Sequence, residues 1–182
     1  ETDRYSKLDS NRILMVGRLS PEKGYERIIP LGKYLKSYYP NWKIEIFGDG
    51  NVYDELKSLY QEHNLDNIFL NKAVQNIKEE YLNSSLLLST SYNEAMPMVF
   101  LEAMSCGVPV LSYRNEGAEC IWEESKNGVI VDTEEELIRK CSNLIEEAGW
   151  RKMLGQNGVK TSKEFSTDNV SVKWYALINS FN

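Results

Sequence analysis

The residues of this chain best suited to chemistry are two glutamates, Glu94 and Glu102, which flank the predicted start of a helix at Pro97. Proline suits the first helical position because the amide that it lacks would have no intrahelical partner there. The free amides of residues 98–100 would then point out of a helix end whose dipole favours an anion. Because carboxylates accept hydrogen bonds from hydroxyls, the pattern predicts a ligand with both phosphate and hydroxyl groups, such as a nucleotide sugar.

Two cations, Arg18 and Lys23, follow directly after an apolar run at residues 12–17. Arginine offers a planar fork of donors and lysine a mobile ammonium, and both suit phosphate oxygens. Cations fixed beside a phosphate would also stabilise negative charge that develops on a departing phosphate oxygen, and they would do so more in the transition state than in the ground state. The alternative is a polar loop with two solvated cations.

The elements that must position these residues alternate between strands and helices. Apolar runs predict strands at 12–17, 42–48, 68–70, 86–89, 108–113 and 128–131. Periodic segments predict helices at 25–39, 52–63, 77–83 and 97–105, and further helices from residue 133 onward; the inner face of the first helix would carry Ile28, Ile29, Leu31, Leu35 and Tyr38. This alternation predicts an α/β, Rossmann-like fold with a six-stranded parallel sheet flanked by helices. Ligands of such sheets bind beyond the carboxyl ends of the strands, so the candidates should converge on one crevice.

Composition narrows the classes of protein. With 182 residues, 42% of them hydrophobic and 26% charged, the chain resembles an ordinary globular domain. We expect a domain over 11–182, preceded by a linker or boundary at 1–10. The net charge of −6 argues against a nucleic-acid partner. Three cysteines without CxxC spacing and a single histidine, His63, predict neither a disulfide framework nor a metal site, so we expect reduced thiols in the cytoplasm.

Several residues have a structural reading beside a functional one. Gly48-Asp49-Gly50 fits a tight strand-to-helix turn. A dinucleotide fingerprint would need a further glycine at Tyr53, which disfavours an NAD-type oxidoreductase. Ser91 and Tyr92 could line a ligand pocket or form a turn. His63 fits a solvated helix end better than a catalyst.

The stretch from Glu94 to Val110 resembles the E-x7-E signature of the retaining GT-B glycosyltransferases of group 1. The match includes Pro97, Ala103-Met104, Gly107 and Pro109-Val110, and it departs from the common form at Ala95 and Met96. Residues 17–24 resemble the G-R-L-x-x-x-K-G element of the same family. The resemblance extends from about residue 11 to residue 181. It implies the C-terminal, donor-binding half of a GT-B fold.

The resemblance also implies roles for individual residues. Arg18 and Lys23 would hold the donor diphosphate, Glu102 would bind the ribose, and Glu94 would position the sugar and stabilise charge. The implied catalytic residues are therefore Arg18, Lys23 and Glu94. The implied donor-binding set adds Gly17, Lys72, Ala73, Val74, Ala95, Met96, Pro97, Met98 and Val99. Residues 72–74 occupy the place where the family's chain wraps the nucleobase.

The implied activity is transfer of a hexose from a nucleoside-diphosphate sugar, of UDP or GDP type, to a glycan, lipid or other acceptor. Bacterial polysaccharide or glycoconjugate biosynthesis is the implied setting. Neither a cofactor nor a metal is implied, since no Asp-x-Asp motif is present. The family's N-terminal acceptor-binding domain would be a separate partner, reached by the last helix with Trp174 and Tyr175. That half could also associate peripherally with the inner face of the plasma membrane.

Two alternatives remain open. The chain could be half of a sugar-nucleotide epimerase, which shares the architecture. It could also be a non-catalytic nucleotide-binding or interaction module on the same fold.

Overall fold

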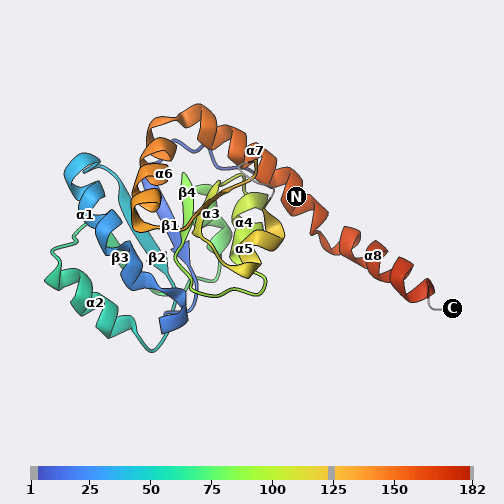
Figure 1. The fold of residues 1–182 in the computed structure, drawn as a ribbon, viewed down its shortest axis with the longest axis horizontal. Helices are drawn as coiled ribbons and strands as arrows, with labels where there is room; N and C mark the ends of the chain where they lie inside the picture. The colour runs from blue at the N-terminus through green and yellow to red at the C-terminus, as the bar shows by residue number, and fades with distance from the viewer. Residues whose placement is uncertain (1–3, 123–125, 181–182) are drawn as a thin grey trace.

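The computed structural model describes residues 4–122 and 126–180 (Figure 1). Its centre is a parallel sheet in the order β3-β2-β1-β4-β5-β6. The strands are β1 (Arg12–Val16), β2 (Lys43–Phe47), β3 (Ile68–Asn71), β4 (Leu86–Ser89), β5 (Val110–Tyr113) and β6 (Val129–Val131). This arrangement confirms the predicted Rossmann-like fold.

Helices cover both faces of this sheet. They are α1 (Ile29–Tyr38), α2 (Tyr53–Glu62), α3 (Ile77–Leu82), α4 (Met98–Ser105), α5 (Glu116–Ile121), α6 (Glu134–Glu146), α7 (Ala148–Glu164) and α8 (Thr167–Asn179), with 3-10 turns η1 (Pro21–Lys23) and η2 (Tyr25–Ile28). In the described part of the chain, no helix combines the length and the apolar character needed to cross a membrane.

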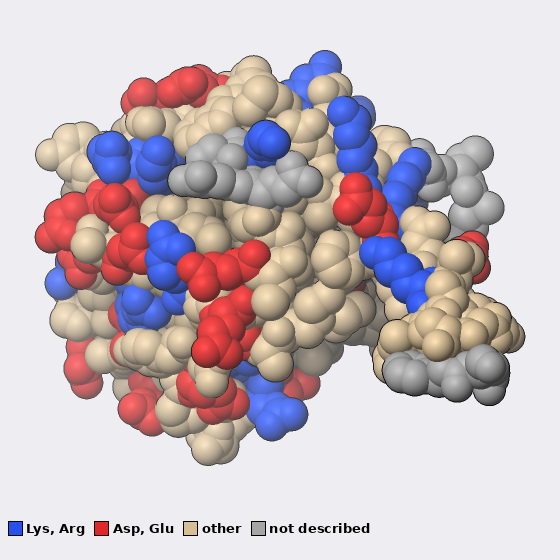
Figure 2. All heavy atoms as spheres, turned by 45° about the vertical axis from the view of Figure 1, so that its right-hand side comes forward, with Lys and Arg blue, Asp and Glu red and all other residues tan. Residues whose placement is uncertain are grey.

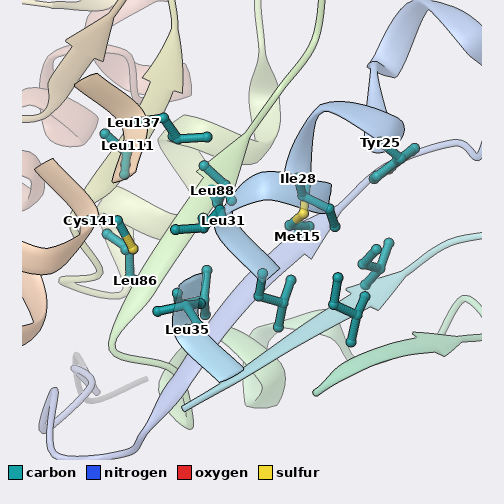
Figure 3. Close-up of a cluster of buried hydrophobic side chains, with 14 of the residues drawn as sticks. Met15, Tyr25, Ile28, Leu31, Leu35, Leu86, Leu88, Leu111, Leu137 and Cys141 are labelled. Atoms are coloured by element: carbon teal, nitrogen blue, oxygen red, sulfur yellow. The ribbon is translucent and has the colours of Figure 1, made fainter. Parts of the chain in front are cut away.

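Strand β1 explains why the core has two halves. Ile13 and Met15 belong to one buried cluster and Leu14 to the other, because successive side chains of a strand point to opposite faces of the sheet. The first cluster lies under α1, α2 and α6. Figure 3 shows part of it, where strand residues meet side chains of α1 and α6, among them Leu31, Leu35, Leu137 and Cys141. The second lies under α3, α4 and α5.

The first helix departs from its sequence prediction in two respects. Residues 25–28 form the 3-10 turn η2, and α1 begins only at Ile29. Pro30, in the first turn of α1, has no amide to bond to the preceding turn, so an α-helix from residue 25 would lose a hydrogen bond there. Tyr38, predicted on the inner face, is 68% exposed and packs on the Tyr34 ring instead. That prediction was wrong.

A short helix that the sequence did not suggest, α5, follows β5. Its N-cap residue Asn115 accepts a hydrogen bond from the Ala118 amide at 2.8 Å. The Gly117 amide donates to the carbonyl of Glu94 at 2.7 Å. Helix α5 therefore contacts the segment that carries one of the two candidate carboxylates.

The order of the strands places the candidate residues together. The chain moves outward from β1 through β2 to β3, then returns to place β4 on the other side of β1. Ligands of open α/β sheets bind where the strand order reverses in this way, beyond the carboxyl ends of the strands. The segments that leave β1 and β4 at this point are residues 17–24 and 90–97.

The two ends of the described chain differ in their contacts. The segment 4–10, predicted as part of a linker, packs against the domain: the Ser6 amide donates to the Cys106 carbonyl at 2.8 Å, and Leu8 is buried. Residues 1–3 of that prediction lie outside the described residues. Helix α8 instead extends away from the body of the molecule (Figure 1) and has no buried residue.

Candidate functional site

An ion pair joins the two segments that leave β1 and β4. Nζ of Lys23 lies 2.6 Å from Oε1 of Glu94, and both side chains are largely buried. The hydroxyl of Ser91 donates to the same oxygen at 2.8 Å. Glu94 is thus held by a cation and a hydroxyl, one from each segment.

A cleft of about 550 Å³ opens beside this ion pair and is lined by Arg18, Glu22, Lys23, Asn93, Glu94 and Ala95. The structure therefore brings four of the sequence-predicted residues together. Glu22 and Asn93 were not predicted, although each is the immediate neighbour of a residue that was. The Ser20 hydroxyl donates to Glu22 at 2.6 Å and lowers the pKa of that carboxyl. The cleft therefore carries carboxylates as well as cations.

A second cleft, of about 530 Å³, lies between α2 and β3. Tyr53, Lys57 and Phe69 are among the residues that line it. It contains none of the residues that the sequence marked for chemistry. The cleft at the ends of β1 and β4, which holds four of the predicted residues, is therefore the candidate functional site.

The start of α4 differs by one residue from the prediction. Pro97 is the N-cap residue, with an extended backbone (φ −76°, ψ 92°), and the helix begins at Met98. The Phe100 amide donates to the Pro97 carbonyl at 2.9 Å, so the prediction that it is free was wrong. In the described part of the chain, the amides of Met98 and Val99 find no hydrogen-bond acceptor. These two amides remain as donors for an anion.

Glu102 lies on the exposed side of α4, one turn beyond this helix start. The hydroxyl of Tyr81, a buried residue of α3, donates to Oε2 of Glu102 at 2.9 Å. Burial and the neighbouring Glu102 carboxylate raise the pKa of Tyr81, which keeps the hydroxyl protonated and able to donate. No local sequence pattern indicates this contact, because the two residues belong to different helices.

Residues 72–74, predicted to contact a nucleobase, lie exposed after β3 and do not line the cleft. Nζ of Lys72 lies 3.7 Å from Asp49 and 4.5 Å from the centre of the Tyr53 ring. Their assignment to the donor site stays a prediction. Met96, also in the predicted set, is 41% exposed.

The glycines of Gly48-Asp49-Gly50 allow a close backbone approach beneath the cleft. A Cβ atom on Gly48 would lie 1.9 Å from the Gly17 carbonyl oxygen, and one on Gly50 would lie 2.0 Å from the Leu19 carbonyl oxygen. Gly17 itself donates its amide to the Phe47 carbonyl at 3.1 Å. These glycines therefore let the Arg18 segment pack on the end of β2.

His63 and the three cysteines lie outside the cleft. His63 caps the carboxyl end of α2, as expected. Cys106, Cys120 and Cys141 are free thiols, the first and last buried. Among residues 4–122 and 126–180, no three His, Cys, Asp or Glu side chains gather in a way that could hold a metal ion. On the face drawn in Figure 2, basic and acidic side chains are interspersed over the globular body.

Comparison with known proteins places this chain in a family. A curated glycosyltransferase of Haemophilus influenzae, itself uncharacterised, is 23% identical over 180 residues, covering 97% of this chain and 51% of that protein. An exopolysaccharide phosphotransferase of Streptomyces coelicolor is 30% identical over 177 residues, covering 94% of this chain and 19% of its own length. The chain thus spans about half or less of these relatives.

The fold of this chain is also similar to that of a solved structure. The crystal structure of a TarM variant from S. aureus, in complex with fondaparinux, α-GlcNAc-glycerol and UDP, superposes with a TM-score of 0.86 at 21% identity. The match covers 97% of this chain and 36% of TarM. The family model described as glycosyl transferases group 1 matches residues 3–161. The chain therefore belongs to the group 1 glycosyltransferase family.

Proposed function

We propose that this chain is the donor-binding half of a retaining, metal-independent glycosyltransferase. It would bind a nucleoside-diphosphate sugar of UDP or GDP type and transfer its hexose to a glycan, lipid or other acceptor during polysaccharide or glycoconjugate biosynthesis. One observation carries the proposal: the Lys23–Glu94 pair, the Arg18 cation and the free amides of α4 lie at the reversal of strand order. The UDP bound to TarM is consistent with this ligand class.

The diphosphate would contact the start of α4 and the two cations. Met98 and Val99 offer amides to phosphate oxygens, while Arg18 lines the open cleft. The Lys23 ammonium has three protons, and its bond to Glu94 occupies only one of them. The other two protons can stabilise the charge that develops on the leaving group.

Glu102 would bind the ribose. Tyr81 holds Oε2, which leaves Oε1 to accept from a diol. Glu102 lies four residues beyond Met98, so the carboxylate stands about 6 Å along the helix axis from the amides at the helix start. That spacing suits a ribose attached to a phosphate at the helix end.

Glu94 would position the sugar rather than attack it. Its Oε1 atom accepts from both Lys23 and Ser91, and each bond draws electron density from the carboxylate. A carboxylate held in this way is a weak nucleophile and a good hydrogen-bond acceptor for sugar hydroxyls. This argument supports departure of the diphosphate and attack by the acceptor on the same face of the sugar, which retains configuration.

A separate acceptor-binding half would complete the enzyme. Helix α8 exposes Val172, Trp174, Tyr175, Leu177 and Ile178, each at least 48% exposed. Exposed apolar surface of this extent is typical of an interaction site. We propose that α8 contacts the acceptor-binding half. We also propose that the complete enzyme acts in the cytoplasm, including the inner face of the plasma membrane.

The test is a calorimetric titration of this chain with UDP, GDP and ADP, repeated in the presence of a metal chelator. We expect one nucleotide to bind selectively and the chelator to leave its affinity unchanged. The Glu102→Ala variant should lose that binding, because it removes the ribose acceptor. Glu55→Ala, an exposed glutamate of α2, is the matched control and should bind as the wild type does.

Binding that survives Glu102→Ala would contradict the assigned donor site. An absence of binding to this chain and also to the chain joined to its acceptor half would favour a non-catalytic module. Dependence of binding on a divalent cation would overturn the metal-independent mechanism.

A further inference from the structure

Arg27, in the 3-10 turn η2 that precedes α1, contacts two tyrosine rings and a backbone carbonyl. Its guanidinium lies 3.4 Å from the centre of the Tyr113 ring, at the end of β5, and 4.7 Å from the centre of the Tyr92 ring. Its Nη1 atom donates to the carbonyl of Thr90 at 2.9 Å. Arg27 therefore joins the turn after β1 to the ends of β4 and β5.

The segments that Arg27 joins are held together at further points. The Tyr92 amide donates to the Glu22 carbonyl at 2.9 Å, and the Thr90 hydroxyl donates to the Lys23 carbonyl at 3.0 Å. Gly24 has a left-handed backbone (φ +61°), and a Cβ atom there would lie 2.5 Å from the Thr90 carbonyl oxygen. The absence of a side chain thus lets the two segments approach one another.

We infer that Arg27 is a positioning residue that holds the segment of Lys23 and the segment of Glu94 in register for the donor sugar. The ion pair alone constrains only two side-chain tips, and each sits on a flexible stem. Arg27 instead fixes the backbone carbonyl of Thr90, four residues before Glu94. A planar guanidinium that lies over two aromatic rings combines cation–π attraction with a directional hydrogen bond, which an ammonium reproduces less well.

The two outer partners of this cluster differ in what they contribute. Tyr113 is buried at the end of a strand, so it supplies a fixed platform. Tyr92 is 56% exposed, and its hydroxyl donates to Glu26 at 2.6 Å. Arg27 thus connects the loop that contains Ser91 and Glu94 to a fixed residue of the sheet, which restricts the motion of that loop.

The experiment compares Arg27→Met, Arg27→Lys and, as a control, Arg139→Met with the wild-type chain. Arg139 is exposed on α6, so its substitution makes the same change of charge and of residue type away from the cleft. The first readout is hydrogen exchange of the Tyr92 amide, whose acceptor lies on the opposite segment. We expect exchange about tenfold faster in Arg27→Met, partial recovery in Arg27→Lys and no change in Arg139→Met.

The second readout rests on the proposed function: the affinity for UDP-glucose relative to UDP, and for GDP-mannose relative to GDP. We expect Arg27→Met to weaken binding of the preferred nucleotide sugar by about tenfold more than binding of its diphosphate. This difference arises because Glu94, and not the start of α4, would contact the sugar. A loss of global stability would instead lower the affinity for the nucleotide sugar and for the diphosphate by the same factor. Thermal denaturation of each variant identifies that case.

Unchanged exchange of the Tyr92 amide in Arg27→Met would overturn the inference. Faster exchange with an unchanged ratio of affinities would overturn the link to the sugar. If the wild-type chain binds none of these nucleotides, the proposed function fails, while the exchange experiment still decides whether Arg27 positions the loop.

Discussion

Lys23 and Glu94 stand 71 positions apart in the sequence, and their side chains meet with 2.6 Å between Nζ and Oε1. This ion pair connects the turn after β1 to the loop after β4 and forms one wall of the cleft. Because both side chains are largely buried, each charge depends on the other for compensation.

A double-mutant cycle on Lys23→Met and Glu94→Gln should therefore give a coupling free energy of about 1–2 kcal/mol. The measurement is denaturant unfolding of the four proteins. The exposed pair of Lys36 and Asp66 is the matched control, and its coupling should be clearly smaller because solvent screens it. Equal coupling in both pairs would show that the cleft pair has no special role.

Tyr81→Phe should weaken nucleotide binding by about three- to tenfold, the effect of one ordinary hydrogen bond, because the lost contact acts on the ligand only through Glu102. Without the hydroxyl, Glu102 would lose the contact that fixes its carboxylate. Calorimetric titration measures the effect. Tyr60→Phe serves as the control, since its hydroxyl donates to the Tyr25 carbonyl in the core. If Tyr60→Phe lowers the affinity as much, the loss reflects the fold rather than Glu102.

Gly117→Ala should displace the segment that carries Glu94, because Gly117 in α5 packs directly against it. A Cβ atom at Gly117 would lie 2.6 Å from the Glu94 carbonyl oxygen and 2.7 Å from Cδ of Pro97. We expect a loss of about 1–3 kcal/mol of unfolding free energy, together with weaker binding of the nucleotide sugar. The control is Gly149→Ala in α7, where nothing lies within 4 Å of the new atom. That variant should be unchanged or more stable by up to about 1 kcal/mol. Unfolding free energies alike in both variants would contradict the close contact.

Alkaline pH should destabilise the chain through Cys141. Burial raises the pKa of this thiol to about 12. In the unfolded chain the thiol loses its proton near pH 8.5, so between these values the folded state binds more protons than the unfolded state. Stability must then fall as pH rises from about 9 towards 12.

Unfolding free energies measured at pH 8 and at pH 10.5 test this prediction. Cys141→Ala should show a smaller decrease between the two pH values than the wild type. The exposed Cys120 provides the control: the unfolding free energy of Cys120→Ala should fall between the two pH values by as much as that of the wild type. An equal decrease in all three proteins would assign the alkaline effect to other groups, such as the buried tyrosines.

Local sequence patterns were sufficient to predict the strands. Buried strands such as β4 are continuous apolar runs bounded by polar residues, so their positions follow from short-range composition. The helix boundaries were less accurate where one residue changes the backbone. Pro30 moved the start of α1, and Pro97 became a cap instead of the first helical residue.

Some residues of the candidate site could be predicted from the sequence, and others could not. Arg18, Lys23, Glu94 and Glu102 could be predicted from the sequence because each lies on the segment or helix that follows a strand and has a side chain suited to phosphate or hydroxyl groups. Tyr81 and Arg27 were not visible. Their contacts, with Glu102 and with Thr90, Tyr92 and Tyr113, join segments whose separation along the chain carries no local signal.

The sequence by itself thus determined the fold class and the family, and it predicted which residues would form a nucleotide-sugar site. Periodicity and turn residues act over a few positions, and a sequence records them directly. Only the tertiary structure decided that Lys23 pairs with Glu94, that Tyr81 holds Glu102 and that Arg27 packs on two aromatic rings. These contacts depend on the strand order β3-β2-β1-β4-β5-β6, which brings distant loops to one edge of the sheet.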